Sequence, residues 1–550
     1  MPSCSTTRRR PTVVVATMLA ASIIVPTSAE AATGTTATGE TDSSIGPKTA
    51  YVDPRFATYD AAVSTVKELR QLGPPVMPGP PGATSTLDPS IYGQWSTLGY
   101  DLPLRAVHVT LLKTGNLLLV AGSGNVSSDN VLGDFKAYLW NPTTGALTAI
   151  PVPYDAFCGG HLVDANGDVT VYGGTTHYKD ASSSWVGSNK VYKYVVSTNQ
   201  WVAMPSMTQG RWYPSMVMDG KKRQFAFSGL DATGKNPSTP EMFDPATNTW
   251  TNVAARGLPL YAGLQLLANG KFGYAGAHFG GSVNPPKVFD PMTGSFTYAS
   301  DPGGVIDLAH RNMGMAAMVG SADRQRVWVA GGLPAVATTY FMDFAANTPL
   351  ASAGPALPTA KGYVSVADLP DLSALETGGG TGTDSPVYEA SILDTSTDAL
   401  TPVAPPAQPR TYHSSALTMP DGRVVTFGGD PAGDAVFNYT IEVFSPPYLF
   451  KGTRPVITAA TTEMHYGHGY TLTAAATGTS LASAVLLRPG SATHSMDSSQ
   501  RALKLVTSPA TGGLRITVPT NPNLAPPGWY MLFVNDGLGR PSVAHWIHLT

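Results

Sequence analysis

The chain has 550 residues, of which only 13% are charged, and it is rich in glycine (57 residues) and proline (47 residues). The formal net charge is -3 and no long basic run follows the first dozen residues, which argues against a nucleic-acid partner. This composition favours short strands joined by tight turns over long helices, so we expect an all-β protein long enough for more than one domain.

Residues 1–31 are typical of a bacterial-type secretory signal peptide. Arginines occupy positions 8–10, an apolar stretch covers 13–25, and residues 29–31 read A-E-A, the pattern of a cleavage site. An N-terminal membrane anchor is the alternative, since about 20 apolar residues span a bilayer. The arginines leave both general secretion and twin-arginine export open. No other long apolar run follows, so we expect a mature chain without a transmembrane span, secreted or associated with the cell envelope.

Residues 32–91 are predicted to be a flexible N-terminal segment with one short helix. The segment begins with a low-complexity run, TGTTATGETDSS. Val63, Val66 and Leu69 then follow at helical spacing, and Gly73 and Pro74 end the pattern. A proline-rich stretch, PPVMPGPPG, follows as a stiff linker.

From residue 92 to residue 447 the chain repeats itself about every 50 residues, which is the period of kelch repeats. Each repeat has a strand-like run that ends in a small doublet: Ala121-Gly122, Gly173-Gly174, Ser228-Gly229, Ala275-Gly276, Gly331-Gly332, Gly379-Gly380 and Gly428-Gly429. A second phrase recurs between strands, as in MFDPATNTW and VFDPMTGSF. Seven doublets predict a seven-bladed kelch-type β-propeller. Turns in unrelated β domains are the alternative.

Residues 448–550 depart from this period but still alternate as strands do, for example in SAVLLRPG and WYMLFVND. About 100 residues suffice for a separate core. We therefore expect a C-terminal immunoglobulin-like β-sandwich domain.

Cys158 is the only cysteine after the leader, because the other, Cys4, lies within it. Cys158, Tyr213 and His413 each lie 16 residues before the last glycine of their doublets. Equivalent positions in different blades can converge near the propeller axis, so these three residues predict one site. A second register, set by Arg211-x-Tyr213 and Arg410-x-Tyr412, aligns the tyrosines instead. Taken singly, the cysteine and the tyrosine fit a buried core, and the histidine fits a strand.

An ordered set of motifs carries a resemblance to a known family. The motifs are FCGGH, GRWYPS, RTYHSSALTMPDGRVVTFGGDP, EVFSPPYLFKGTRP, VLLRPGSATHSMDSSQR and PPGWYMLFVNDGLGRPSVAHWIHL. Together they resemble the copper radical oxidases, the family of glyoxal oxidase and galactose oxidase. The resemblance runs from about residue 92 to the C-terminus, in order and through both expected domains.

The resemblance implies a copper ion and a cross-linked cofactor. The Cys158 sulfur would bond to a ring carbon of Tyr213 as a thioether. Tyr213, Tyr412, His413 and His494 would be the metal ligands, an N,O set that suits Cu(II). Copper would hold one oxidising equivalent and a tyrosyl radical on the cross-link the other. Tyr412 would be the general base.

The activity implied is oxidation of a small aldehyde or primary alcohol, carbohydrates included, with reduction of O2 to hydrogen peroxide. Two departures favour the glyoxal oxidase-like branch. The stretch SGLDATGK lacks the tryptophan that stacks on the cross-link in galactose oxidase, which leaves Tyr261 or His278 as candidates. The chain before residue 92 is also too short for galactose oxidase's N-terminal sandwich.

The histidines of HYGH (His465, His468) and HWIH (His545, His548) are interpreted as structural. A monomer is expected. The alternative functions are a non-catalytic propeller that binds glycan or protein at the cell surface, and a copper protein without redox turnover.

Overall fold

The computed structural model describes residues 87–550 except 238, 255–256, 282 and 432–435. The expected leader, Cys4 and the short helix near residues 60–72 lie outside the described residues. The described part is all-β, as predicted. Its helices are short: α2 (Pro89–Tyr92), α3 (Ser127–Leu132) and the 3-10 turns η1 (Leu308–His310), η2 (Ala322–Arg324) and η3 (Pro447–Phe450).

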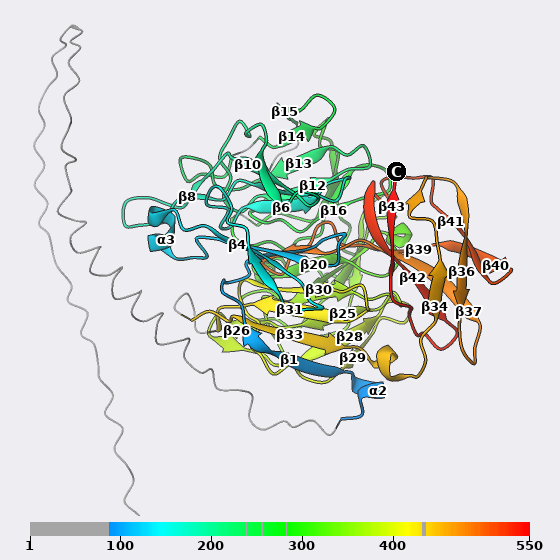
Figure 1. The fold of residues 1–550 in the computed structure, drawn as a ribbon. Helices are drawn as coiled ribbons and strands as arrows, with labels where there is room; N and C mark the ends of the chain where they lie inside the picture. The colour runs from blue at the N-terminus through cyan, green and yellow to red at the C-terminus, as the bar shows by residue number, and fades with distance from the viewer. Residues whose placement is uncertain (1–86, 238, 255–256, 282, 432–435) are drawn as a thin grey trace, which may run out of the picture. The chain divides into compact units, whose positions relative to one another are not determined.

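Residues 94–445 form seven antiparallel sheets of four or five strands, one of which includes a strand from the C-terminal region (Figure 1). The first joins β2 (His108–Leu111), β3 (Leu117–Gly122), β4 (Lys136–Trp140) and β5 (Leu147–Ala149), and the second β6 (Gly160–Val163), β7 (Val169–Tyr172), β10 (Val191–Val195) and β11 (Gln200–Ala203). The third joins β12 (Ser215–Met218), β13 (Gln224–Phe227), β14 (Glu241–Asp244) and β15 (Thr249–Asn252), and the fourth β16 (Leu264–Leu266), β17 (Phe272–Tyr274), β18 (Lys287–Phe289) and β19 (Phe296–Tyr298).

The remaining three sheets follow the same plan. The fifth joins β20 (Met315–Met318), β21 (Arg326–Ala330), β22 (Tyr340–Asp343) and β23 (Leu350–Ala353), and the sixth β24 (Ser365–Asp368), β25 (Ala374–Thr377), β28 (Ala390–Asp394) and β29 (Ala399–Pro402). The seventh joins β30 (Ser414–Thr418), β31 (Val424–Gly428) and β33 (Thr440–Ser445). Two hairpins lie between strands of these sheets: β8 (Thr175–His177) with β9 (Val186–Gly187), and β26 (Gly380–Gly382) with β27 (Ser385–Pro386).

Burial falls from the first strand of a sheet to its last. β6 and β7 are buried along their whole length, whereas β11 is mostly exposed. The third sheet shows the same gradient from β12 to β15. Residues that immediately precede a first strand are therefore held deep inside the molecule, which suits a site that must exclude water.

Two strands reach the seven sheets from distant parts of the chain. β1 (Gln94–Asp101) pairs with β33 and completes the seventh sheet, and the two lie side by side in Figure 1. β38 (Ser491–Thr493) pairs with β2 and adds a fifth strand to the first sheet. The C-terminal region thus contributes strand β38 to the same sheet as β2.

Glycine doublets end the second strand of the sheets, as their spacing predicted. Gly173 and Gly174 have φ of 66° and 115°, and a Cβ on Gly173 would clash with the carbonyl oxygen of Arg211. Only glycine fits this close approach to the next sheet. In the sixth sheet the doublet is Gly378-Gly379 and not Gly379-Gly380, because the positive φ angles of 73° and 99° begin one residue earlier.

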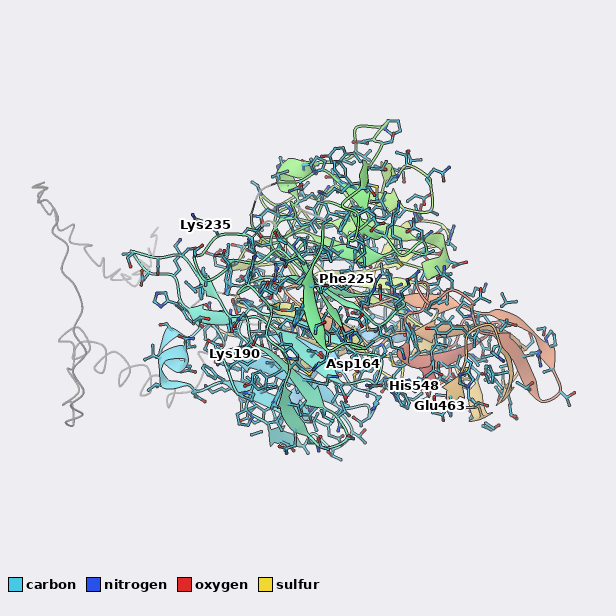
Figure 2. The ribbon with its side chains drawn as sticks, turned by 90° about the horizontal axis from the view of Figure 1, so that it is seen from above. Asp164, Lys190, Phe225, Lys235, Glu463 and His548 are labelled. Atoms are coloured by element: carbon cyan, nitrogen blue, oxygen red, sulfur yellow. The ribbon has the colours of Figure 1, made fainter. Side chains whose placement is uncertain are left out.

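The C-terminal residues form two more sheets. One contains β34 (Val456–Ala459), β36 (Gly469–Ala475), β41 (Gly513–Thr517) and β40 (Val506–Ala510), and the other β35 (Glu463–Met464), β43 (His545–Leu549), β42 (Gly528–Asp536), β37 (Leu481–Leu487) and β39 (Ala502–Lys504). His548 pairs with Glu463 at 3.1 Å, and its Nε2 lies 2.9 Å from the carbonyl oxygen of Ala165, next to Asp164 (Figure 2). That histidine thus joins the C-terminal sheets to the turn after β6. None of the described helices is both long and apolar enough to cross a bilayer.

Candidate metal centre

Cys158, Tyr213 and His413 occupy the same backbone position in three sheets. Each comes one or two residues before a first strand, β6, β12 or β30, and their φ angles are 57°, 65° and 63°. A side chain other than glycine in this left-handed region costs on the order of 1–3 kcal/mol, and such residues cluster at functional sites. The shared left-handed backbone therefore makes this position a candidate functional position.

Three other sheets carry a positive-φ residue at this position: Tyr261, Met313 and Tyr363. Backbone hydrogen bonds join neighbours in the series, from Tyr213 N to the Cys158 carbonyl (2.9 Å) and from Tyr261 N to the Tyr213 carbonyl (3.0 Å). Residues about 50 positions apart in sequence are therefore adjacent in space, as the repeat predicted.

The two registers proposed for the tyrosines and histidine are both present. Three buried arginines donate from Nη1 to the first carbonyl of the doublet in their own sheet: Arg211 to Ser228 (2.7 Å), Arg311 to Gly331 (2.9 Å) and Arg410 to Gly428 (2.8 Å). Tyr213 follows its arginine by two positions, whereas His413 follows Arg410 by three. The seventh sheet thus has one extra residue before β30, which places Tyr412 beside His413.

His494 enters the site at the end of β38. Its Nδ1 lies 2.6 Å from the Thr493 hydroxyl, and that hydroxyl donates its proton to the Val107 carbonyl at 3.0 Å. The hydroxyl must therefore accept from Nδ1, which assigns the proton to Nδ1 and leaves a lone pair on Nε2. That Nε2 lies 3.6 Å from Cys158 Sγ.

His413 is also held through its Nδ1 atom, but by a different partner. Its Nδ1 lies 2.7 Å from Asp430 Oδ2, and the Arg105 guanidinium pairs with the same carboxylate. Arg105 Nη2 also lies 2.6 Å from Nδ1, so both members of the buried ion pair hold this atom, and Nε2 is the ring nitrogen directed toward Cys158 Sγ, at 3.8 Å. Burial, with Arg105 as the next cause, lowers the pKa of His413 well below its usual value, so the imidazole is neutral.

Cys158, His413 and His494 form the group of possible metal ligands found in the described part of the chain, with ligand atoms within 4.8 Å of one another and all three residues buried. Two tyrosine rings adjoin it. The Tyr213 ring centroid lies 4.8 Å from that of His494, and the Tyr412 centroid lies 3.8 Å from that of His413. Two neutral imidazoles and two phenols are a donor set that fits Cu(II).

Two aromatic rings stack on Tyr213. Trp212 stacks on Tyr213 with centroids 3.7 Å apart and planes at 6°, and Tyr261 stacks on it at 4.4 Å and 28°. The Tyr261 hydroxyl donates to the Gly159 carbonyl at 2.5 Å. His278 instead faces Tyr274 and Gly276, so of the two stacking candidates only Tyr261 lies against Tyr213. Sequence reasoning missed Trp212, although it stands next to Tyr213 in RWYP.

The carboxylate behind His413 gives a testable expectation. Asp430→Asn keeps an acceptor for His413 Nδ1 but takes away the negative charge that faces the buried Arg105 guanidinium. We expect copper affinity to fall by about 10- to 100-fold, the usual effect of losing a partner that orients a ligating histidine. Competition against a copper chelator measures it, with Asp421→Asn, which removes the exposed ion pair with Arg423, as the control. Equal affinities in both variants would contradict the assignment.

A second buried histidine pair lies beside the site. His108 and His161 face each other at 3.3 Å between their Nδ1 atoms, and neither Nε2 has a hydrogen-bond partner among the described residues. Burial lowers the pKa of His161 from 6.5 to about 4. Burial disfavours the protonated form of both rings, so both imidazoles are held neutral.

This pair predicts how stability depends on pH. Between pH 6.5 and 4 the unfolded chain binds a proton at His161 and the folded chain does not. The free energy of unfolding therefore falls as pH falls, by about 3 kcal/mol for this group. His161→Gln should flatten the slope of denaturant-derived stability against pH in this window. His468→Gln, in an exposed turn, serves as the control, and an unchanged slope in His161→Gln would refute the expectation.

The sequence is similar to that of several known proteins. Residues 454–549 match the family model Galactose oxidase-like, Early set domain. Galactose oxidase of Gibberella zeae is 29% identical over 502 residues, covering 83% of this chain and 71% of that protein. Aldehyde oxidase GLOX of Vitis pseudoreticulata is 37% identical over 169 residues, covering 27% of this chain and 31% of that protein.

A solved structure supports the fold. It is described as a novel fungal alcohol oxidase with catalytic diversity among the AA5 family, in complex with copper, and it superposes with a TM-score of 0.72 at 24% identity, covering 84% of this chain and 100% of that one. Sequence similarity over 502 residues, the C-terminal domain model and a shared fold point the same way: together they support a relationship to the copper radical oxidases, which are copper-dependent oxidases.

Proposed function

We propose that the protein is an exported, glyoxal oxidase-like enzyme that oxidises a small aldehyde or a primary alcohol. A primary alcohol would give the aldehyde, and a hydrated aldehyde the acid, while O2 takes the two electrons and two protons removed and leaves as hydrogen peroxide. The observation that carries this proposal is the buried group of Cys158, His413 and His494 with the rings of Tyr213 and Tyr412 against it.

The proposed ligands are the Nε2 atoms of His413 and His494 and the hydroxyl oxygens of Tyr213 and Tyr412. Cys158 is the proposed thioether partner of Tyr213. When bound, copper supplies one oxidising equivalent, and the linked Cys158 and Tyr213 supply the other. Asp430 and Thr493 hold the Nδ1 atoms of the two imidazoles, so each ring directs its Nε2 to the site.

Tyr412 is the proposed general base. It is half-buried, whereas Tyr213 is 4% exposed, so Tyr412 is the tyrosine of the two that a substrate hydroxyl can approach. It would take the hydroxyl proton of the substrate. Trp212 and Tyr261 stack on Tyr213 and exclude water from its ring.

We propose the surrounding architecture and location as well. The seven sheets would be the blades of a kelch-type propeller spanning residues 92–447, with β1 completing the last blade. Residues 448–550 would form an immunoglobulin-like sandwich that supplies His494. Residues 1–31 would be the signal peptide of a secreted or envelope-associated monomer.

The deciding experiment is mass analysis of the copper-loaded protein. We expect an intact mass lower by two hydrogen atoms, because forming the Cys158–Tyr213 bond removes one hydrogen from each partner, and a digest should locate the loss to the joined peptides. The same preparation should release hydrogen peroxide with small aldehydes or primary alcohols. Copper-loaded protein that shows neither the deficit nor peroxide across a broad substrate panel would refute the proposal.

One observation favours a second candidate, a copper site without substrate turnover. Two histidines and a cysteine around one point are also the donor set of electron-transfer copper sites. In that case Cys158 would remain a thiolate ligand and the hydrogen deficit would be absent. The same mass measurement therefore separates the two functions, and it also separates the enzyme from a non-catalytic propeller that binds glycan or protein.

A further inference from the structure

Four aromatic side chains form a continuous series from the proposed cofactor to the protein surface. Trp212 stacks on Tyr213 at 3.7 Å, Trp185 stacks on Trp212 at 4.9 Å with planes at 10°, and Tyr178 lies 4.5 Å from Trp185. Tyr213 and Trp212 are buried, whereas Trp185 and Tyr178 are half-buried. We refer to these four residues as the aromatic column.

The local fold holds the outer end of this column in place. Tyr178 directly follows β8 and Trp185 directly precedes β9, so the hairpin brings the two rings together. Asp180 stabilises the hairpin loop by accepting hydrogen bonds from the backbone N–H of Ser182 (2.7 Å) and Ser183 (2.8 Å). Both rings pack on the edge of the core and stay partly exposed, so the hairpin extends the series of rings from the buried site to solvent.

We propose that the aromatic column is a one-electron path by which a soluble one-electron oxidant at the hairpin surface oxidises the linked Cys158 and Tyr213. This rests on the proposed function, which makes Tyr213 redox-active. Among the side chains present here, those with indole and phenol rings are readily oxidised by one electron. Several short transfers between rings in contact are faster than one long transfer between the two ends of the column.

The proposed transfer moves one electron and involves only the aromatic column and the oxidant. The oxidant takes one electron from Tyr178 or Trp185, that residue is refilled from the next ring inward, and Tyr213 loses the electron in the end. All other members of the column return to their starting state. The net change is one oxidant reduced and one cross-linked tyrosine oxidised, and no proton leaves Tyr213 because, as a copper ligand, it would already be a phenolate.

The hydrogen bonds of the column determine where protons go. Trp212 Nε1 is buried and has no hydrogen-bond partner in the described part of the chain, so its oxidised ring has no base to which it could lose the indole proton. At the outer end Ser123 donates to Asp155 Oδ2 at 2.6 Å, so the Tyr178 hydroxyl donates to Ser123 Oγ at 2.7 Å. Tyr178 can therefore pass its proton toward Asp155 on oxidation and recover it on reduction, while the inner tryptophan transfers electrons alone.

Two substitutions test this path without removing the rings from their places. Trp185→Phe keeps an aromatic ring that is far harder to oxidise, and Tyr178→Phe removes only the hydroxyl. Trp201→Phe is the matched control, since Trp201 lies on β11, is half-buried and packs against Tyr194 outside the column. Copper(II)-loaded protein with the cross-link in its unoxidised state is mixed with hexachloroiridate(IV), and the reaction is followed by loss of the oxidant's visible absorbance.

We expect Trp185→Phe to lower the second-order rate by about tenfold or more, equivalent to about 1.4 kcal/mol in the barrier, with a smaller loss in Tyr178→Phe and none in Trp201→Phe. Copper content and the mass deficit of the cross-link should match wild type in all three. Rates equal to wild type in both column variants would overturn the path, and Tyr178→Phe decides alone if Trp185→Phe does not fold. Absence of the mass deficit in wild type would refute the proposed function instead.

Discussion

Cys158→Ser should abolish the two-hydrogen mass deficit and reduce peroxide release to the background of copper-free protein. Serine retains the approximate size of the side chain but offers no sulfur to join to the Tyr213 ring, so the second oxidising equivalent is lost. The two imidazoles keep their orientation, because Asp430 and Thr493 set it. Copper should therefore still bind with nearly the wild-type stoichiometry.

Met313→Leu provides the matched control for that variant. Met313 has the same left-handed backbone in another sheet, with φ of 58°, but it is not one of the proposed metal ligands. It should retain both the mass deficit and peroxide release. Full activity in Cys158→Ser, with copper bound, would contradict the role given to the sulfur.

Tyr412→Phe should lower kcat by about 10²- to 10⁴-fold, the range for loss of a general base. The ring remains beside His413, where the centroids lie 3.8 Å apart, so the packing of the site should survive. Because the proton acceptor is lost and the cross-link is not, the mass deficit should persist while turnover falls. Steady-state peroxide assays measure the turnover.

Tyr298→Phe, at an exposed tyrosine on β19, is the control for Tyr412→Phe. A second check is the substrate isotope effect, since loss of the base should change which step limits the rate. If Tyr412→Phe turns over at the wild-type rate, proton removal must be assigned to another group.

The repeat pattern allowed much of this site to be predicted from the sequence. A spacing of 16 residues to a glycine doublet linked Cys158, Tyr213 and His413, and the structure gives all three the same left-handed backbone. The doublet itself has a physical cause, because a Cβ on Gly428 would clash with the His413 carbonyl. Spacing worked because each repeat folds into the same local structure.

Residues that lie outside the repeat could not be found in this way. His494 follows β38, and only the motif resemblance identified it. Arg105 and Asp430 form an ion pair although they lie near opposite ends of the repeats, and nothing in the sequence pairs one arginine with one aspartate. Trp185 lies beside a short hairpin strand and not in the repeated part of a sheet, so periodicity carries no information about it.

The register of the seventh sheet shows why two consistent patterns disagreed. Arg410 matches Arg211 in its hydrogen bond to a doublet carbonyl, while His413 matches Tyr213 in its backbone angle. A single extra residue between them satisfies both patterns. Sequence spacing could align one or the other, and only the folded chain shows that both hold.

The late position of His494 has a consequence for biosynthesis. Cys158 Sγ and His494 Nε2 are separated by 336 positions in the chain, and β38 pairs with β2 only after those positions have been synthesised. Domains generally form in the order in which they leave the ribosome, so the seven sheets can assemble before His494, the last of the proposed ligands, exists. Metal retention would then be the final event of maturation, and a chain cut short before residue 491 would fold most of its sheets yet lack one of its two imidazoles.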